Sequence, residues 1–293
     1  MDHITKSQEE TIMNTVNQQN DEASSTLSEW DIEWLDVDAY LTRVGYDGDL
    51  TPTADTLRAL HRAHAATIPF ENLDIVLGRT IPLDIASLQE KLLRHRRGGY
   101  CFEHNLLFAA LLERIGFGVK RLAARVQPGK PGPRTHMLLI VEAEGAKWLA
   151  DVGFGAALIE PIPFRDGAVS HQGGWTYGLD SRDDGTWLLR SSTPDGWVDL
   201  YAFTLEPQRP VDYVVHNHYT ATHPDSPFVG QAVAIRTTPE VRHTLRGREI
   251  STSRPDGTSE RRDLTDEDLP GVLRQTFGIA LEPDKLAGLR SGT

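Results

Sequence analysis

The feature that most constrains the fold is a change in hydrophobic period near residue 117. Before this point, apolar residues recur at helical intervals in Thr53–Ala66, Ala86–Arg94 and Cys101–Ile115. After it, short strand-like runs separated by Gly, Pro and Asp take over, at 119–126, 136–143, 147–154, 186–192, 197–205 and 232–238. The chain therefore predicts an α+β fold in which a small helical bundle precedes an antiparallel barrel or sandwich.

Several structural units are expected, because 293 residues exceed the roughly 250 that a single hydrophobic core usually serves. Residues 1–30 are polar and carry six acidic side chains against Lys6, which predicts a disordered extension. We place the helical bundle at 31–116, the β-rich unit at 117–210 and a mixed α/β unit at 211–293.

The closing unit begins after a polar, proline-bearing stretch around Glu206–Pro227. Strand-like segments follow near Val233 and Glu249, and a helix is expected from about Thr265 to Phe277. This mixture predicts an α/β unit packed beside the barrel.

Composition excludes several classes of protein. A formal charge of −12 repels nucleic-acid phosphates, so nucleic-acid binding is not expected. No apolar run reaches the ~18 residues of a membrane helix, and the first residues lack the pattern of a secretory signal. With 39% hydrophobic residues the chain is expected to fold as a globular protein, by default in the cytoplasm.

The single cysteine, Cys101, is the first candidate for chemistry. One cysteine forms no disulfide within the chain and builds no Cys-rich zinc site, so it is either structural or reactive. Gly98 and Gly99 precede it, and an amphipathic helix starts at it. The positive end of a helix favours a thiolate, and the unpaired N–H groups there could stabilise an oxyanion. Two glycines before a helix are also an ordinary turn, so a base is needed.

His136 and Asp151 supply that base and its orienting carboxylate. His136 starts one strand-like run and Asp151 ends the next, with Glu144–Gly145 between them as a hairpin turn. If the hairpin centres on this dipeptide, His136 lies opposite Gly153, and Asp151 faces the same side of the sheet. Diagonal neighbours lie ~7–8 Å apart, within reach of a side-chain hydrogen bond. The pattern predicts a Cys-His-Asp relay, unless the turn slips by one residue.

Three motifs around these residues resemble the arylamine N-acetyltransferase family. They are Arg97–Asn105 (RGGYCFEHN), Thr135–Leu139 (THMLL) and Asp151–Gly155 (DVGFG). Further matches stand at Ile68–Leu73, Phe203–Leu205, Asn217–Tyr219 and Thr222–Phe228. The resemblance spans about residues 36–280; the segment before Trp30 is longer than the usual family start.

The resemblance implies a helical bundle, a central antiparallel β-barrel and a C-terminal α/β lid, around a triad core like that of cysteine proteases. It implies ping-pong transfer of acetyl from acetyl-CoA, through Cys101, to arylamines, arylhydrazines and arylhydroxylamines. It places the acceptor near Phe70, Thr135, Phe154 and Gly155. It places CoA near Lys130, Gly132, Arg134, Thr222, Ser226 and Phe228, although the proline-rich loop departs from the family here.

Other readings stay open at this point. The same triad serves cysteine hydrolases, transglutaminase-like enzymes and amide synthases that close macrolactams. His61 and His64 share a helical face as metal ligands do, and His216 and His218 are also close in sequence. No acidic or Cys partner stands at ligand spacing, so solvated histidines are the better interpretation and no metal is expected. The physiological acceptor and the oligomeric state, including a homo-oligomer, stay open.

Overall fold

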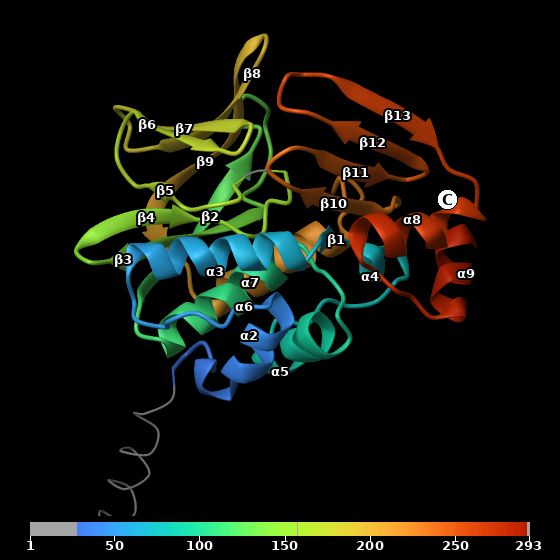
Figure 1. The fold of residues 1–293 in the computed structure, drawn as a ribbon, viewed down its shortest axis with the longest axis horizontal. Helices are drawn as coiled ribbons and strands as arrows, with labels where there is room; N and C mark the ends of the chain where they lie inside the picture. Colours follow the sequence, from blue (N-terminus) through green and yellow to red (C-terminus); the bar gives the residue numbers. More distant parts are fainter. Residues whose placement is uncertain (1–27, 157, 292–293) are drawn as a thin grey trace, which may run out of the picture.

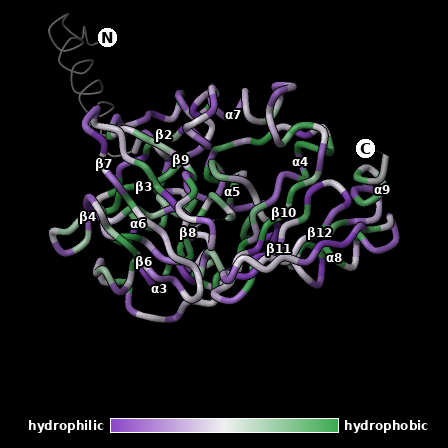
Figure 2. The backbone as a smooth tube through the Cα atoms, turned by 90° about the horizontal axis from the view of Figure 1, so that it is seen from above, coloured by the Kyte–Doolittle hydropathy of each residue, from purple (hydrophilic) through white to green (hydrophobic). Residues whose placement is uncertain are grey.

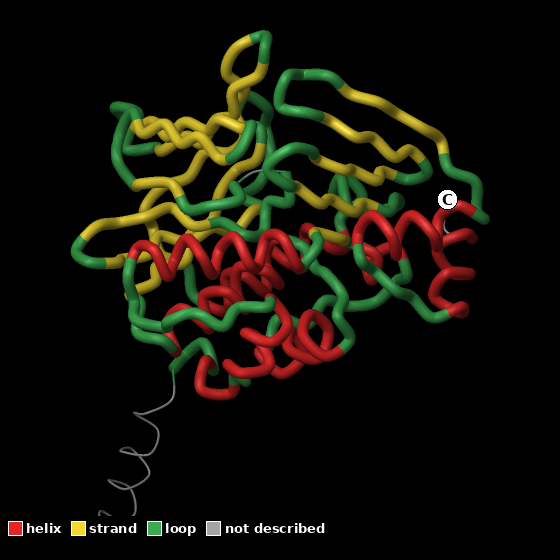
Figure 3. The backbone as a smooth tube through the Cα atoms, in the orientation of Figure 1, coloured by secondary structure: helices red, strands yellow, loops and turns green. Residues whose placement is uncertain are grey.

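The computed structural model describes residues 28–156 and 158–291, so the prediction for residues 1–27 lies outside the described part. Helices form one layer, and two antiparallel sheets lie above it (Figure 1, Figure 3). Figure 2 shows hydrophobic stretches in the interior and hydrophilic ones along the outer loops. None of the helices in the described ranges is long and apolar enough to cross a membrane.

The N-terminal layer is helical, as expected. Its elements are η1 (Ile32–Trp34), α2 (Val37–Val44), α3 (Ala54–Thr67), α4 (Leu73–Val76), α5 (Ile85–Leu88), the π-helical η2 (Gln89–Arg94) and α6 (Cys101–Arg114). The helix expected from Thr53 begins one residue later, because Thr53 is its cap: the Thr53 hydroxyl accepts from the Thr56 N–H at 3.2 Å. Helix α6 is buried from Cys101 through Leu112, which makes it the central helix of the bundle.

The second layer is an eight-stranded antiparallel sheet that forms a nearly closed barrel, in the order β5-β4-β3-β2-β9-β8-β7-β6. The edge strands β5 and β6 are joined by a turn of four residues, 164–167, which brings the two ends of the sheet together. Its strands are β2 (Gly118–Val126), β3 (His136–Ala143), β4 (Ala146–Ala150), β5 (Ile162–Pro163), β6 (Ala168–Gln172), β7 (Trp175–Ser181), β8 (Trp187–Thr193) and β9 (Gly196–Pro207).

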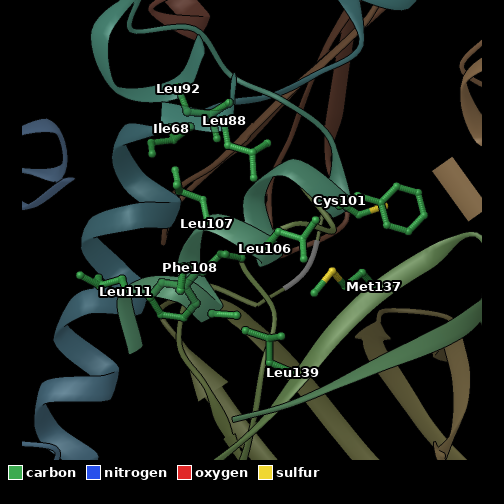
Figure 4. Packing of buried hydrophobic residues seen from close by; sticks show 14 of the residues in the cluster. Ile68, Leu88, Leu92, Cys101, Leu106, Leu107, Phe108, Leu111, Met137 and Leu139 are labelled. Atoms are coloured by element: carbon green, nitrogen blue, oxygen red, sulfur yellow. The ribbon is translucent and has the colours of Figure 1, made fainter. Parts of the chain in front are cut away.

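Strand β3 joins the barrel to the bundle. Its residues are buried on both faces: Leu138 and Ile140 pack in the barrel core, whereas Met137 and Leu139 pack with the helices. Figure 4 shows Met137 and Leu139 facing Leu106 and neighbouring side chains of α6. The strand expected over 147–154 ends at Ala150, because the chain turns at Asp151 into the loop that holds the site.

The third unit contains a five-stranded sheet in the order β1-β10-β11-β12-β13, covered by helices. Its elements are β10 (Val233–Thr237), β11 (Arg242–Arg246), β12 (Glu249–Ser253), β13 (Ser259–Asp263), α8 (Asp268–Phe277) and α9 (Pro283–Ser291). The edge strand β1 (Phe70–Glu71) comes from the helical region and pairs Phe70 with Ile235. The early segment that carries Phe70 is therefore built into the closing sheet.

The stretch around Glu206–Pro227, which the sequence indicates only as polar and proline-bearing, contains the helix α7 (Pro210–Thr222). Its valines do not mark the buried face of the helix, because Val211, Val214 and Val215 are 64%, 59% and 65% exposed. The buried contact is made by Tyr213, whose hydroxyl donates to the Leu122 carbonyl at 3.0 Å. Helix α7 thus packs against the bundle and the barrel.

Candidate active site

The two glycines before Cys101 are required by close backbone packing. The Gly99 carbonyl accepts from the Glu71 N–H at 2.7 Å. A Cβ at Gly98 would lie 2.0 Å from the Pro69 carbonyl oxygen, and one at Gly99 would lie 2.7 Å from Oε2 of Glu103. Any side chain at either position would displace backbone or a buried carboxylate, so the turn that presents Cys101 depends on both glycines.

Buried charges hold the start of α6. The Glu103 carboxylate accepts from the Tyr100 N–H at 3.0 Å and pairs with Lys91 at 2.7 Å. Burial raises the pKa of Glu103, and the attraction of Lys91 offsets that rise only in part. Lys91 also pairs with Asp74 at 2.9 Å, and Arg97 with Glu71 at 2.7 Å. The helix that carries Cys101 is therefore tied to α4, η2 and β1.

Cys101 is the first residue of α6 (Figure 4). Cys101 is 3% exposed, and its Sγ lies 3.5 Å from the Thr135 carbonyl oxygen. Thr135 immediately precedes β3, so the thiol meets the strand that starts with His136.

The hairpin has the register that the sequence predicts. Leu139 pairs with Ala150 and Ala143 with Ala146, around a turn in which Glu144 and Gly145 have φ of 52° and 78°. Two successive positive φ angles are typical of a type I′ turn, which fits the twist of a hairpin. The predicted proximity is confirmed: Nε2 of His136 lies 2.7 Å from Oδ2 of Asp151.

The charges of this pair reinforce one another. Burial alone lowers the pKa of His136, but the attraction and hydrogen bond of Asp151, together with a hydrogen bond to Cys101, raise it to about 10. For Asp151, burial raises the pKa, whereas His136 and two further donors bring it below its usual value. Because Nε2 is bound to the carboxylate, we assign the hydrogen bond with Cys101 to Nδ1 of His136.

Four donors fix the Asp151 carboxylate. Oδ2 accepts from His136 and from the Tyr201 hydroxyl at 2.9 Å, while Oδ1 accepts from Nδ2 of Asn105 and the Gly153 N–H, both at 3.0 Å. The same Asn105 amide group also donates to the Met137 carbonyl at 2.7 Å. Asn105 and Tyr201 were not predicted as site residues, although alternation along β9 turns both Tyr201 and Phe203 inward.

The prediction that His61 and His64 are solvated is wrong. Both side chains are 0% exposed and engaged in hydrogen bonds, because the face of α3 that carries them packs against α6. Within the described residues, no group of three His, Cys, Asp or Glu is arranged to hold a metal ion.

The residues predicted for the acceptor lie together beside the triad. The Phe154 ring packs edge-on against His136, with centroids 5.0 Å apart. Gly155 has φ of +74°, and a Cβ there would lie 2.8 Å from Cγ of Phe70. Phe70 and Phe154 therefore flank the loop after Asp151, and Thr135 contacts the thiol from the strand side.

The residues predicted for CoA lie on two segments. Lys130 bonds to Gln127 at 2.9 Å, Arg134 pairs with Glu206 at 3.2 Å, and Gly132 has open space around it. The second segment is the end of α7 and the residues after it. Thr222 ends the helix, and the hydroxyls of Thr222 and Ser226 donate to backbone carbonyls. The Phe228 ring packs on that of Phe70, with centroids 5.7 Å apart.

Comparison with known proteins shows the family to which the chain belongs. A family profile described as N-acetyltransferase matches residues 53–286. An arylamine N-acetyltransferase of Mycobacterium tuberculosis is 40% identical over 256 residues, covering 84% of this chain and 89% of that protein. The chain belongs to the arylamine N-acetyltransferase family.

Solved structures of the family superpose on nearly the whole chain. The arylamine N-acetyltransferase of Nocardia farcinica is 42% identical with a TM-score of 0.85, covering 90% of this chain and 96% of that one. The Mycobacterium marinum enzyme, solved in complex with CoA, is 35% identical with a TM-score of 0.81, covering 87% and 98%. The fold of this chain is thus that of the family.

Proposed function

We propose that this chain transfers acetyl from acetyl-CoA to the nitrogen of arylamines and arylhydrazines, by way of a thioester on Cys101. The observation that carries the proposal is the 2.7 Å bond between His136 and Asp151 beside the thiol, in a chain of this family. Arylhydroxylamines belong to the same proposal, because their oxygen would attack the thioester as an amine nitrogen does.

In the first half-reaction, Nδ1 of His136 takes the thiol proton and the Cys101 sulfur attacks the acetyl carbonyl. The new carbon–sulfur bond forms as the bond to the CoA sulfur breaks, and the imidazolium returns its proton to the leaving CoA thiolate. Asp151 holds the imidazole in the required tautomer throughout and stabilises its charged form. The raised pKa of His136 fits this role, because it favours the imidazolium form that holds the proton taken from the thiol.

In the second half-reaction, the acceptor amine attacks the acetyl carbonyl after CoA has left. His136 takes the amine proton, and the Cys101 thiolate leaves as the amide forms. Phe70, Phe154 and Gly155 would border the acceptor, where aromatic side chains stack against an aryl ring and exclude water. Thr135 would border the acetyl group, because its carbonyl lies against the thiol.

CoA would reach the thiol from the side of the loop before Thr135. Lys130 and Arg134 offer cations for its phosphates, and Gly132 allows close approach of backbone. Thr222, Ser226 and Phe228 would border the same cleft from the end of α7. The steps proposed above use only the side chains of Cys101, His136 and Asp151. We propose the cytoplasm as the location of this chemistry.

The test is a steady-state assay of CoA release with acetyl-CoA and an arylamine or arylhydrazine, varying both. Ping-pong transfer predicts parallel double-reciprocal lines, and Cys101→Ser should abolish the product. His136→Gln should do the same, whereas His171→Gln, which changes an exposed histidine on β6, serves as the matched control. Release of CoA without an N-acetyl product would instead indicate hydrolysis, and turnover only with a carrier-bound acyl chain would indicate an amide synthase.

A further inference from the structure

Helix α3 presents two buried histidines to the site, and the mechanism above uses neither. His61 and His64 stand three residues apart on one face of the helix, both 0% exposed. The Phe108 ring of α6 packs against both, with centroid distances of 5.8 Å and 5.5 Å. From this common position, the hydrogen bonds of His64 lead toward Cys101, and those of His61 lead to Asp151.

His64 leads to the nucleophile through His104. Nε2 of His104 lies 3.0 Å from the Gly99 carbonyl oxygen and 3.2 Å from that of Pro69. Carbonyl oxygens only accept, so this nitrogen carries the proton. In a neutral ring Nδ1 is then an acceptor, and it lies 2.8 Å from Nε2 of His64.

The same logic continues to Tyr40. Because Nε2 of His64 donates to His104, Nδ1 of His64 accepts, and the Tyr40 hydroxyl donates to it. The chain Tyr40, His64, His104, Gly99 thus runs in one direction with every ring nitrogen satisfied. Burial lowers the pKa of His104 to about 4 and holds that of His64 well below its ordinary value, so both rings stay neutral as this pattern requires.

His61 leads to the carboxylate. Its Nδ1 lies 2.9 Å from the Ile159 carbonyl oxygen and therefore donates, so Nε2 accepts the backbone N–H of Asp151 at 3.2 Å. Burial lowers the pKa of His61 to about 4, which keeps Nε2 free to accept. The side chain of Asp151 is held by four donors, and its backbone is held by this fifth contact.

We propose that α3 positions both halves of the triad: His64, acting through His104, fixes the Gly99 carbonyl two residues before Cys101, and His61 fixes the backbone of Asp151. All three histidines are positioning residues and none touches substrate. The inference rests on the proposed function, because it assigns their effect to the rate of Cys101 acetylation. Displacing a reacting group by about 1 Å costs on the order of 10²-fold in rate.

Paired substitutions separate positioning from packing. His104→Leu removes the donor to Gly99, whereas His104→Gln places an amide N–H near the lost Nε2. His61→Leu removes the acceptor for Asp151, whereas His61→Gln places an amide oxygen there. Phe108→Leu is the matched control, because it removes the ring that contacts both α3 histidines and leaves these hydrogen bonds intact. Asparagine, too short to reach the Nε2 position, replaces leucine where a leucine variant does not fold.

Two readouts are taken on each folded variant, beside its melting temperature. The first is the single-turnover rate of acetyl-enzyme formation with acetyl-CoA. The second is the pH profile of alkylation by iodoacetamide, which reports on Cys101 alone because the chain has one cysteine. The leucine variants should lose about 10²-fold in acetylation rate and shift the alkylation profile. The glutamine variants should recover most of both, and Phe108→Leu should lose stability only.

Leucine variants that keep the wild-type rate and profile would overturn the inference. So would a loss that Phe108→Leu reproduces at an equal drop in melting temperature, since that would reflect packing. A wild-type protein that forms no acetyl-enzyme would refute the proposed function instead, and the alkylation profiles would still decide the positioning.

Discussion

Asp151→Asn is the substitution whose outcome the structure determines most completely. An amide replaces one carboxylate oxygen with an NH₂ group, and both oxygens of Asp151 accept from two donors. On the Oδ1 side, the Gly153 N–H is fixed by the backbone, and Asn105 also bonds to Met137 and the Val152 N–H. On the Oδ2 side, His136 can exchange its tautomer. The new NH₂ group should therefore face His136.

That orientation inverts the imidazole. Nε2 of His136 would become the acceptor and Nδ1 would carry the proton, so the nitrogen facing Cys101 could no longer take the thiol proton. In Ser-His-Asp proteases the equivalent exchange lowers kcat about 10⁴-fold, and a similar loss, about 5.4 kcal/mol of transition-state stabilisation, is expected here. The pKa of His136 should also fall, because Asp151 contributes its largest upward shift.

The assay is the single-turnover rate of acetyl-enzyme formation, together with the far-ultraviolet spectrum and melting temperature. A fold that is retained with a rate about 10⁴-fold lower supports the tautomer argument. A rate within a few fold of wild type would refute it. A matched control is Asp166→Asn, which changes an exposed carboxylate in the turn between β5 and β6.

Three further predictions concern stability. Gly155→Ala should destabilise the fold by about 1–2 kcal/mol or more, because Gly155 has φ of +74° and the new Cβ would lie 2.8 Å from Phe70; unchanged urea unfolding would contradict this. Lys91→Met should cost about 3–5 kcal/mol by leaving the buried Glu103 unpaired. Adding Glu103→Gln to that variant should restore part of the loss, and no recovery would argue against the pairing. Stability should fall on both sides of neutral pH in urea titrations. His136 has a raised pKa, so it contributes stability below pH 6.5 that is lost as the pH rises toward about 10. His61 and His104 have depressed pKa values, so they contribute stability above pH 6.5 that is lost as the pH falls toward about 4. A stability that rises steadily through alkaline pH would contradict the His136 assignment.

Local signals explain which parts of the site the sequence predicts. Glu144–Gly145 fixes a two-residue turn, and the turn fixes the register that brings His136 to Asp151. The glycines before Cys101 and the helix after it are equally local. Each of these features depends on a few neighbouring residues, which is why spacing alone reveals them.

Contacts between distant segments escape this reasoning. The prediction that His61 is solvated was wrong because its partner, the Asp151 N–H, is 90 residues away in the sequence. Nothing near His61 in the sequence indicates that partner. Strand β1 is only two residues long, and its partner β10 begins at Val233. Helix α7 was missed because its valines face outward, so its apolar pattern does not mark the buried side.

The central claim is that Cys101 carries the acetyl group between two half-reactions, and intact-protein mass spectrometry tests it most directly. The protein is mixed with acetyl-CoA, freed of CoA and then given an arylamine, with the mass followed at each step. We predict a gain of one acetyl group, located on Cys101 by peptide mapping, that the amine removes as an N-acetyl product. No gain, or a gain that persists in Cys101→Ser, would contradict the account.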